Sequence, residues 1–318
     1  MKRLIVALAS LAALGLSGPA ASRVRYAPQP NLTGLWSSAS LTGLERPDDF
    51  KSLTIPEAEA LAFEKSHRGK TPDIGDKDNP VGGPDSEWWE TDFGLARIRG
   101  QVRTSWIVAP ADGKRPRNAA DMAAGKAMRE SRKRPPDGPE SRDSDERCLG
   151  YGGAGPPLEN SGLNDNFQIV QAGDQLAIEA EWMHDVRSVR IGLGAAHPPS
   201  SLRLPNGDSI GHWEGQSLVI ETTNFIPAQV HAPDEDPAAD MRVVERLTRV
   251  SRDELLYSYS VTNPARYTQT WRAEMLLHAT KGPIYEYACH EGNYALEHIL
   301  SAARRLEGKT IDGVAAGR

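Results

Sequence analysis

Apolar residues at every second position recur in a series of short runs between residues 163 and 290. In the clearest run, 255–262, an apolar or aromatic side chain occupies every odd-numbered position. A period of two residues is typical of a strand with one buried face. Tight turns such as Asn263-Pro264 separate the runs, so the sequence predicts an antiparallel meander, and closing it into a barrel leaves no exposed edge. The expected strands are 167–170, 176–189, 212–213 with 218–225, 242–250, 255–262, 267–277 and 284–289.

Fewer elements are expected in the first half of the chain and at its end. A first strand opens at 31–36, a short helix is predicted over 56–66, and a strand pair over 97–109. Asn293 can cap a C-terminal helix with an apolar stripe. The predicted fold class is therefore mainly β: an antiparallel meander that closes into a barrel, with a short N-terminal helix and a C-terminal helix.

The N-terminus has the pattern of a secretory signal peptide. Lys2 and Arg3 precede an apolar run over 4–16, and small residues follow it, which predicts cleavage near residues 20–22. The apolar run is too short to span a membrane, which takes about 20 residues. We expect a protein without a membrane span that is exported to the periplasm or secreted. The formal net charge of −6 offers no broad cationic surface to phosphate, so no nucleic-acid partner is expected.

A polar segment interrupts the predicted globular domain. Residues 112–147 are rich in charges and proline. This composition offers little apolar surface to bury, so we expect a flexible insertion with a short helix around 119–132, and a docking segment is the alternative. The full predicted organisation is a signal peptide over 1–22, one domain made of 23–111 and 148–308, the insertion over 112–147, and a tail over 309–318.

Cys148 and Cys289 are the two cysteines of the chain. A single pair in an exported protein favours a disulfide over two free thiols. The bond would close a loop of about 140 residues, which the chain-entropy model associates with about 4–5 kcal/mol of stability. A metal site is the alternative, although neither cysteine lies in a Cys-x-x-Cys pattern.

Several short stretches, taken together, carry a family resemblance. They are LERP at 44–47, RTSWIV at 103–108, ERC at 146–148, QIVQ at 168–171, MHDVR at 183–187, GHWEG at 211–215, ETTNF at 221–225 and YEYACHEGNY at 285–294. As a set they resemble a large family of exported bacterial proteins for which no biochemical function is established. The resemblance covers nearly all of the mature chain. Separately, Gly34-x-Trp36 is similar to the opening of lipocalin-like barrels, so the predicted barrel is lipocalin-like.

His184 is the first candidate for chemistry. The alternation of 176–189 places it on the same face as Trp182, so we expect it inside the barrel, where an imidazole can act as an acid or a base. A core histidine held by hydrogen bonds is the alternative. Asp185 and Arg187 would share the opposite, outer face and can pair there.

His290 is the second candidate, beside Cys289 at the start of the C-terminal helix. There the alternative is a disulfide with a capping arrangement that fixes the helix. A zinc site made of His184, His212 and His290 lacks any short-range ligand spacing. The P-loop motif does not occur. The sequence therefore predicts no metal and no cofactor.

Aromatic residues are expected to line the barrel interior, and they define the functional hypotheses. The leading hypothesis is an exported barrel that binds a small apolar or aromatic molecule. The first alternative is a cofactor-independent lyase, isomerase or hydratase that uses His184, and the second is a structural envelope protein with a filled core. A cavity reaching His184 would favour the first two, and a filled interior the third. The predicted ligand-binding residues are Trp182, His184, Trp213, Tyr257, Tyr259 and Trp271.

Overall fold

The computed structural model describes residues 29–67 and 93–307, apart from 132, 143–145, 150–152, 161, 163, 193 and 228–238. The predicted signal peptide and the tail 309–318 therefore lie outside the described residues.

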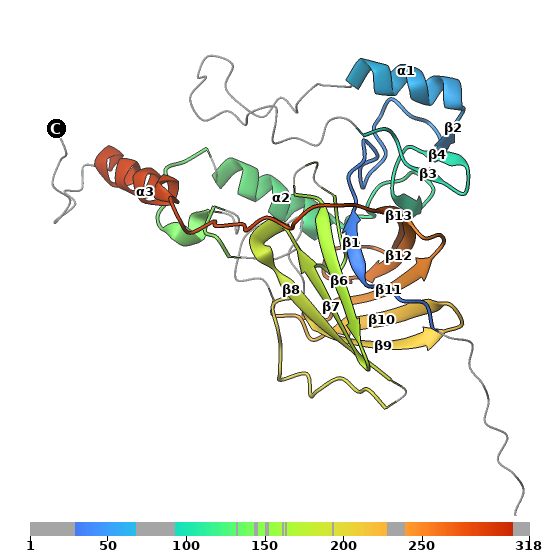
Figure 1. The fold of residues 1–318 in the computed structure, drawn as a ribbon. Coiled ribbons are helices and arrows are strands. Elements are labelled where there is room, and N and C mark those ends of the chain that lie inside the picture. Colours follow the sequence, from blue (N-terminus) through green and yellow to red (C-terminus); the bar gives the residue numbers. More distant parts are fainter. Residues whose placement is uncertain are drawn as a thin grey trace, which may run out of the picture.

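A closed ring of nine strands forms the body of the molecule (Figure 1). The order around the ring is β1-β6-β7-β8-β9-β10-β11-β12-β13, and β1 also pairs with β13, which closes it. The mainly-β prediction with a closed barrel is confirmed. The ring strands are β1 (Gly34–Ser37), β6 (Asn166–Ala172), β7 (Gln175–Ala180), β8 (Val186–Ile191), β9 (Asp208–Glu214), β10 (Ser217–Thr223), β11 (Arg242–Arg249), β12 (Glu254–Thr262) and β13 (Trp271–Ala279).

The remaining elements lie around the ring. β5 (Ile107–Ala109) extends the large sheet beside β13, and a small second sheet contains β2 (Thr54–Ile55), β4 (Gln101–Arg103) and β3 (Arg97–Ile98). In Figure 1, α1 lies with the small sheet, whereas α2 and α3 lie on the other side of the molecule. The predicted helices are confirmed to within one or two residues as α1 (Glu57–His67), α2 (Ala119–Ser131) and α3 (Tyr294–Leu306).

Alternate side chains of each ring strand point inward and form the core. On β12 these are the odd-numbered residues of the predicted alternation, such as Leu255 and Tyr257, and both are buried. Trp36 is also buried, and its Nε1 donates to the carbonyl oxygen of Leu32 at 3.1 Å. The guanidinium of Arg249 lies 5.2 Å from the Trp36 ring centroid, a cation–π contact. The Gly34-x-Trp36 stretch thus lies in the strand that closes the ring.

One neighbouring pair departs from the meander, because β8 and β9 run parallel. A parallel pair needs a crossover connection, which residues 192–207 supply. His197 Nδ1 lies 2.7 Å from Asp208 Oδ2, and Arg190 donates to both oxygens of that carboxylate at 2.8 and 2.9 Å. Burial raises the pKa of Asp208, but the hydrogen bonds from Arg190 and His197 outweigh it and lower that pKa. These contacts tie the crossover to the outside of the ring.

The predicted strand 176–189 is in fact two strands, and this changes the position of His184. β7 ends before the short 3-10 turn η3 (Trp182–His184), and β8 begins after it. Met183 and His184 have φ values of 59° and 53°, a left-handed conformation that reverses the chain. The prediction that His184 lies inside the barrel is wrong, because its side chain is exposed. The predicted outer pair of Asp185 and Arg187 is also wrong, because Arg187 is buried in the interior.

Residues 280–289, here called the strap, run outside the ring from β13 towards α3 (Figure 1). The strand predicted over 284–289 does not form, because this segment runs over the surface and pairs with no strand in the described part of the chain. The backbone N–H of Thr280 donates to the carbonyl of Leu35 at 3.0 Å. The N–H of Tyr285 donates to Glu181 Oε1 at 3.1 Å.

The far end of the strap is held by the predicted disulfide, which is confirmed. Cys289 is bonded to Cys148, with the two Cα atoms 5.6 Å apart. Asn293 is the N-cap residue of α3, but its side chain makes no capping bond. Its Nδ2 instead lies 3.2 Å from Cys148 Sγ and donates to the carbonyl of Glu146 at 3.0 Å.

Residues 112–147 make contacts that their composition did not predict. Arg115 Nε donates to Glu45 Oε1 at 2.8 Å, at the edge of the barrel. Asp121 on α2 is buried and accepts a hydrogen bond from Arg266 at 3.1 Å. Polar side chains therefore anchor the first part of this segment, and the flexibility of the rest stays a prediction.

Trypsin is expected to cut the folded, oxidised protein first after Lys133. Lys133 is exposed and follows the end of α2, whereas the bond after the exposed Arg134 leads into Pro135 and resists trypsin. The neighbouring Arg132 lies outside the described residues. The fragments should stay together, because Asp121 holds α2 to the barrel and β1 is part of the ring. Mass spectrometry and gel filtration of the digest check this, and a first cut inside a ring strand would contradict it.

Candidate functional site

A buried ion pair occupies the middle of the barrel. Arg187 on β8 and Glu245 on β11 have side chains that are 1% and 0% exposed. Two hydrogen bonds of 2.6 and 2.7 Å join the guanidinium to the carboxylate. Burial lowers the pKa of Arg187, but the Glu245 carboxylate outweighs it and raises that pKa above the ordinary value. The Arg187 guanidinium is therefore charged, and the Glu245 carboxylate compensates for its desolvation.

Tyr257 completes this network. Its hydroxyl donates to Glu245 Oε1 at 2.7 Å. Burial and then the negative charge of Glu245 raise the pKa of Tyr257 well above its ordinary value. The phenol thus stays protonated and acts as a fixed hydrogen-bond donor rather than as an acid or a base.

The chain's own residues 153–158, here called the plug, enter the barrel beside this network. Arg187 Nε donates to the carbonyl of Ala154 at 2.8 Å, and the N–H of Leu158 donates to Tyr257 Oη at 2.9 Å. Both plug residues are completely buried. Gly155 has a φ of 69°, and a Cβ there would lie 2.6 Å from a backbone atom of Pro157. Only glycine fits this position, so the tight turn within the plug depends on it.

Three of the six predicted ligand-binding residues come together inside the barrel. The rings of Tyr257 and Tyr259 lie 5.1 Å apart, and Tyr259 and Trp271 lie 5.7 Å apart. Trp213 is half-buried on β9 and packs against the core, and Trp182 lies in the turn η3 with its ring 5.1 Å from that of Tyr287. The aromatic row belongs to the packed core, because its first member binds the plug.

The two predicted catalytic histidines lie apart, on the surface. His184 Nε2 is 3.2 Å from Glu179 Oε1 on the outside of β7. His290 is exposed between the strap and α3. His212 is exposed on β9, where its Nε2 lies 3.1 Å from Glu214 Oε1. Within the described ranges, no three ligating side chains are grouped as a metal site would require.

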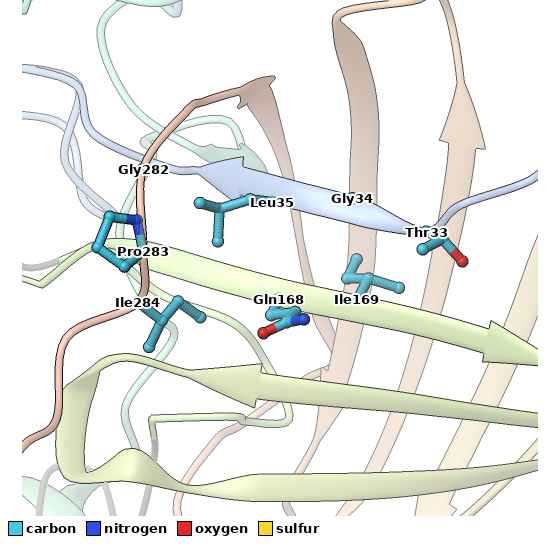
Figure 2. Close-up of a pocket in the computed structure, with 8 residues that line it drawn as sticks. All are labelled: Thr33, Gly34, Leu35, Gln168, Ile169, Gly282, Pro283 and Ile284. Carbon is cyan, nitrogen blue, oxygen red and sulfur yellow. The ribbon is translucent and has the colours of Figure 1, made fainter.

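A pocket of about 400 Å³ lies between the outer side of the ring and the strap. Figure 2 shows Pro283 and Ile284 of the strap beside Leu35 of β1 and Gln168 of β6. Small-molecule sites typically have volumes of about 300–1,000 Å³ and mostly apolar walls with a few polar groups. The residues that line this pocket are Thr33, Gly34, Leu35, Gln168, Ile169, Gly282, Pro283 and Ile284.

The lining is uncharged and comes from three distant parts of the chain. None of the eight lining residues is ionisable, and Thr33 and Gln168 supply its polar side chains. Sequence reasoning missed the pocket because each contributing segment is only two or three residues long. The alternation on β6 does place Gln168 on the outer face, but no local pattern indicates that the strap covers it.

Among the helices that the structure describes, none has both the length and the apolar character needed to cross a membrane. Comparison of the chain with models of known protein families, with curated proteins and with solved structures gave no significant match.

Proposed function

We propose that this protein is an exported binding protein for a small apolar or aromatic molecule, and that the ligand lies in the pocket under the strap. The observation that carries the proposal is the pocket itself, whose volume and largely apolar lining suit such a ligand. The strap is attached at both ends, by its hydrogen bond to Leu35 and by the disulfide of Cys289. A wall fixed in advance reduces the ordering that binding would otherwise require.

The interior of the barrel is the less suitable place for a ligand. The plug already lies beside Tyr257, where hydrogen bonds to Arg187 and Tyr257 hold it in place. A ligand at this level would have to displace Ala154 and Leu158 and leave Arg187 without one of its acceptors. Buried polar groups that lose a partner cost about 1–3 kcal/mol each, so the outer pocket is favoured.

Export is the part of the proposal that places the protein in the periplasm or outside the cell. The signal-peptide pattern of residues 1–22 supports it. The disulfide between Cys148 and Cys289 also supports it, because such bonds persist in oxidising compartments. The family resemblance of the sequence points the same way.

Filling the pocket should weaken binding. We expect Leu35→Trp to weaken binding of the neutral aromatic probe N-phenyl-1-naphthylamine by about tenfold or more, equivalent to at least 1.4 kcal/mol. Fluorescence titration of the purified mature protein measures this affinity. Val170→Trp is the matched control, since Val170 is exposed on β6 but does not line the pocket. Equal affinities of the two variants would contradict the location of the site.

The natural ligand can be sought directly. Native mass spectrometry of protein purified from the periplasm should show a bound small molecule that is missing from the Leu35→Trp protein. The plug and its ion pair favour a second candidate function, a structural envelope protein with a filled core. That candidate predicts no bound molecule and no effect of Leu35→Trp on any probe. The alternative of a lyase, isomerase or hydratase required His184 inside the barrel, and His184 does not lie there.

A further inference from the structure

A row of three side chains leads from the pocket to the pair formed by Glu179 and His184. Leu35 on β1 lies opposite Gln168 on β6, and Gln168 lies opposite Glu179 on β7. Side chains at directly opposite positions of antiparallel strands share a face, with Cβ atoms about 4.5–5.5 Å apart. Leu35 and Gln168 line the pocket, so Glu179 is the next side chain beyond its edge.

His184 is joined to this row through Glu179. Its Nε2 lies 3.2 Å from Glu179 Oε1, and the two side chains are 47% and 28% exposed, so both reach solvent. The left-handed backbone at Met183 and His184 turns the chain back next to β7. Because Nε2 faces Glu179, Nδ1 is the ring nitrogen that can serve a ligand.

The pair of Glu179 and His184 differs from another surface pair of the same residue types in its place next to the pocket. His212 and Glu214 form a similar pair on β9, at 3.1 Å and with side chains 48% and 50% exposed. Neither of those residues lines the pocket or lies opposite a residue that does. The row that includes Gln168 therefore distinguishes the pair at His184 from an ordinary surface pair.

From this arrangement we propose that the pocket selects ligands that carry a hydroxyl group, an alcohol or a phenol, on an apolar body. The inference rests on the proposed function. The apolar body lies against Leu35, Pro283 and Ile284. The hydroxyl lies at the polar edge, where it accepts a hydrogen bond from the Gln168 amide and donates one to His184 Nδ1. A hydroxyl suits both roles because it carries one donor and two acceptor positions.

The test compares two probes that differ by the hydroxyl alone, 2-naphthol and naphthalene. We expect the mature protein to bind 2-naphthol about tenfold more tightly, by equilibrium dialysis. Gln168→Leu and His184→Asn should each reduce this preference several-fold, because each removes one of the two partners of the hydroxyl. Asparagine is chosen at position 184 because it tolerates the left-handed backbone. His212→Asn is the matched control and should keep the full preference.

Each outcome separates this inference from the proposed function. Equal binding of the two probes by the wild-type protein would overturn the selection of a hydroxyl and leave the pocket as the binding site. A preference that survives both variants would overturn the assigned residues. If neither probe binds and Leu35→Trp changes nothing, the proposed function fails and this inference fails with it. Melting temperatures of the variants show that each is folded, and Gln168→Leu provides a result independent of the strained turn at His184.

Discussion

Replacing Glu245 by glutamine is expected to lower the free energy of unfolding by about 3–5 kcal/mol. Glutamine keeps the shape of the side chain, so the loss comes from the charge and not from a cavity. Arg187 would remain buried beside an uncharged amide, and the guanidinium cannot give up its proton. Urea unfolding followed by tryptophan fluorescence measures the change, with an unchanged m-value showing that the same surface is exposed.

The matched control is the ion pair between Arg246, one residue away on β11, and Glu214 on β9. Arg246 donates to Glu214 Oε2 at 2.6 Å, but these side chains are 40% and 50% exposed. Glu214→Gln should therefore cost less than about 1 kcal/mol. Arg187→Met combined with Glu245→Gln should cost less than the two single changes added together, because no charge remains buried alone. A Glu245→Gln protein as stable as the Glu214→Gln protein would contradict the buried pair.

Removing the disulfide is the change with the next largest expected effect. The double variant Cys148→Ser and Cys289→Ser should lose about 4–5 kcal/mol of unfolding free energy, because the bond closes a long loop in the unfolded chain. The sequence separation of the two cysteines is 141 residues. Urea unfolding under oxidising conditions measures the loss.

Reduction offers the control for this second prediction. The wild-type protein in a dithiol reductant should unfold at nearly the same urea concentration as the double variant, and the reductant should leave the variant unchanged. A loss below about 1 kcal/mol would show that the chain-entropy account does not apply to this loop. The strap should also become more accessible to proteases in the double variant, since Cys289 is its attachment to the segment before the plug.

Local patterns predicted those parts of the fold that depend on neighbouring residues. The alternation in 255–262 indicates both the strand β12 and its inward face, and the composition of 119–132 indicates α2. The alternation in 176–189 misled because it continues through the turn at Met183 and His184. Neither residue is a glycine or proline, so no turn signal marks the place where the inward positions change from even to odd numbers.

The interior network was partly visible in the sequence. One face of β11 carries Val243, Glu245 and Leu247 at alternate positions. A charged residue between two apolar ones on an inward face indicates a buried partner. The identity of that partner was not visible, because Arg187 was assigned to the outer face. The pocket depends on the path of the strap over β1 and β6, and no periodicity encodes the packing of such distant segments.

Closure of the ring by its first strand also sets an order of events during synthesis. β1 pairs with β6 and with β13, whereas the strands from β6 to β13 pair mainly with their neighbours in sequence. Contacts between distant segments form late, since the entropy of the intervening loop must be lost first. A chain that emerges N-terminus first therefore carries β1 without its final partner until β13 has been made. Until that moment the sheet of the nascent protein has two open edges, which are the places where strands of other chains can pair.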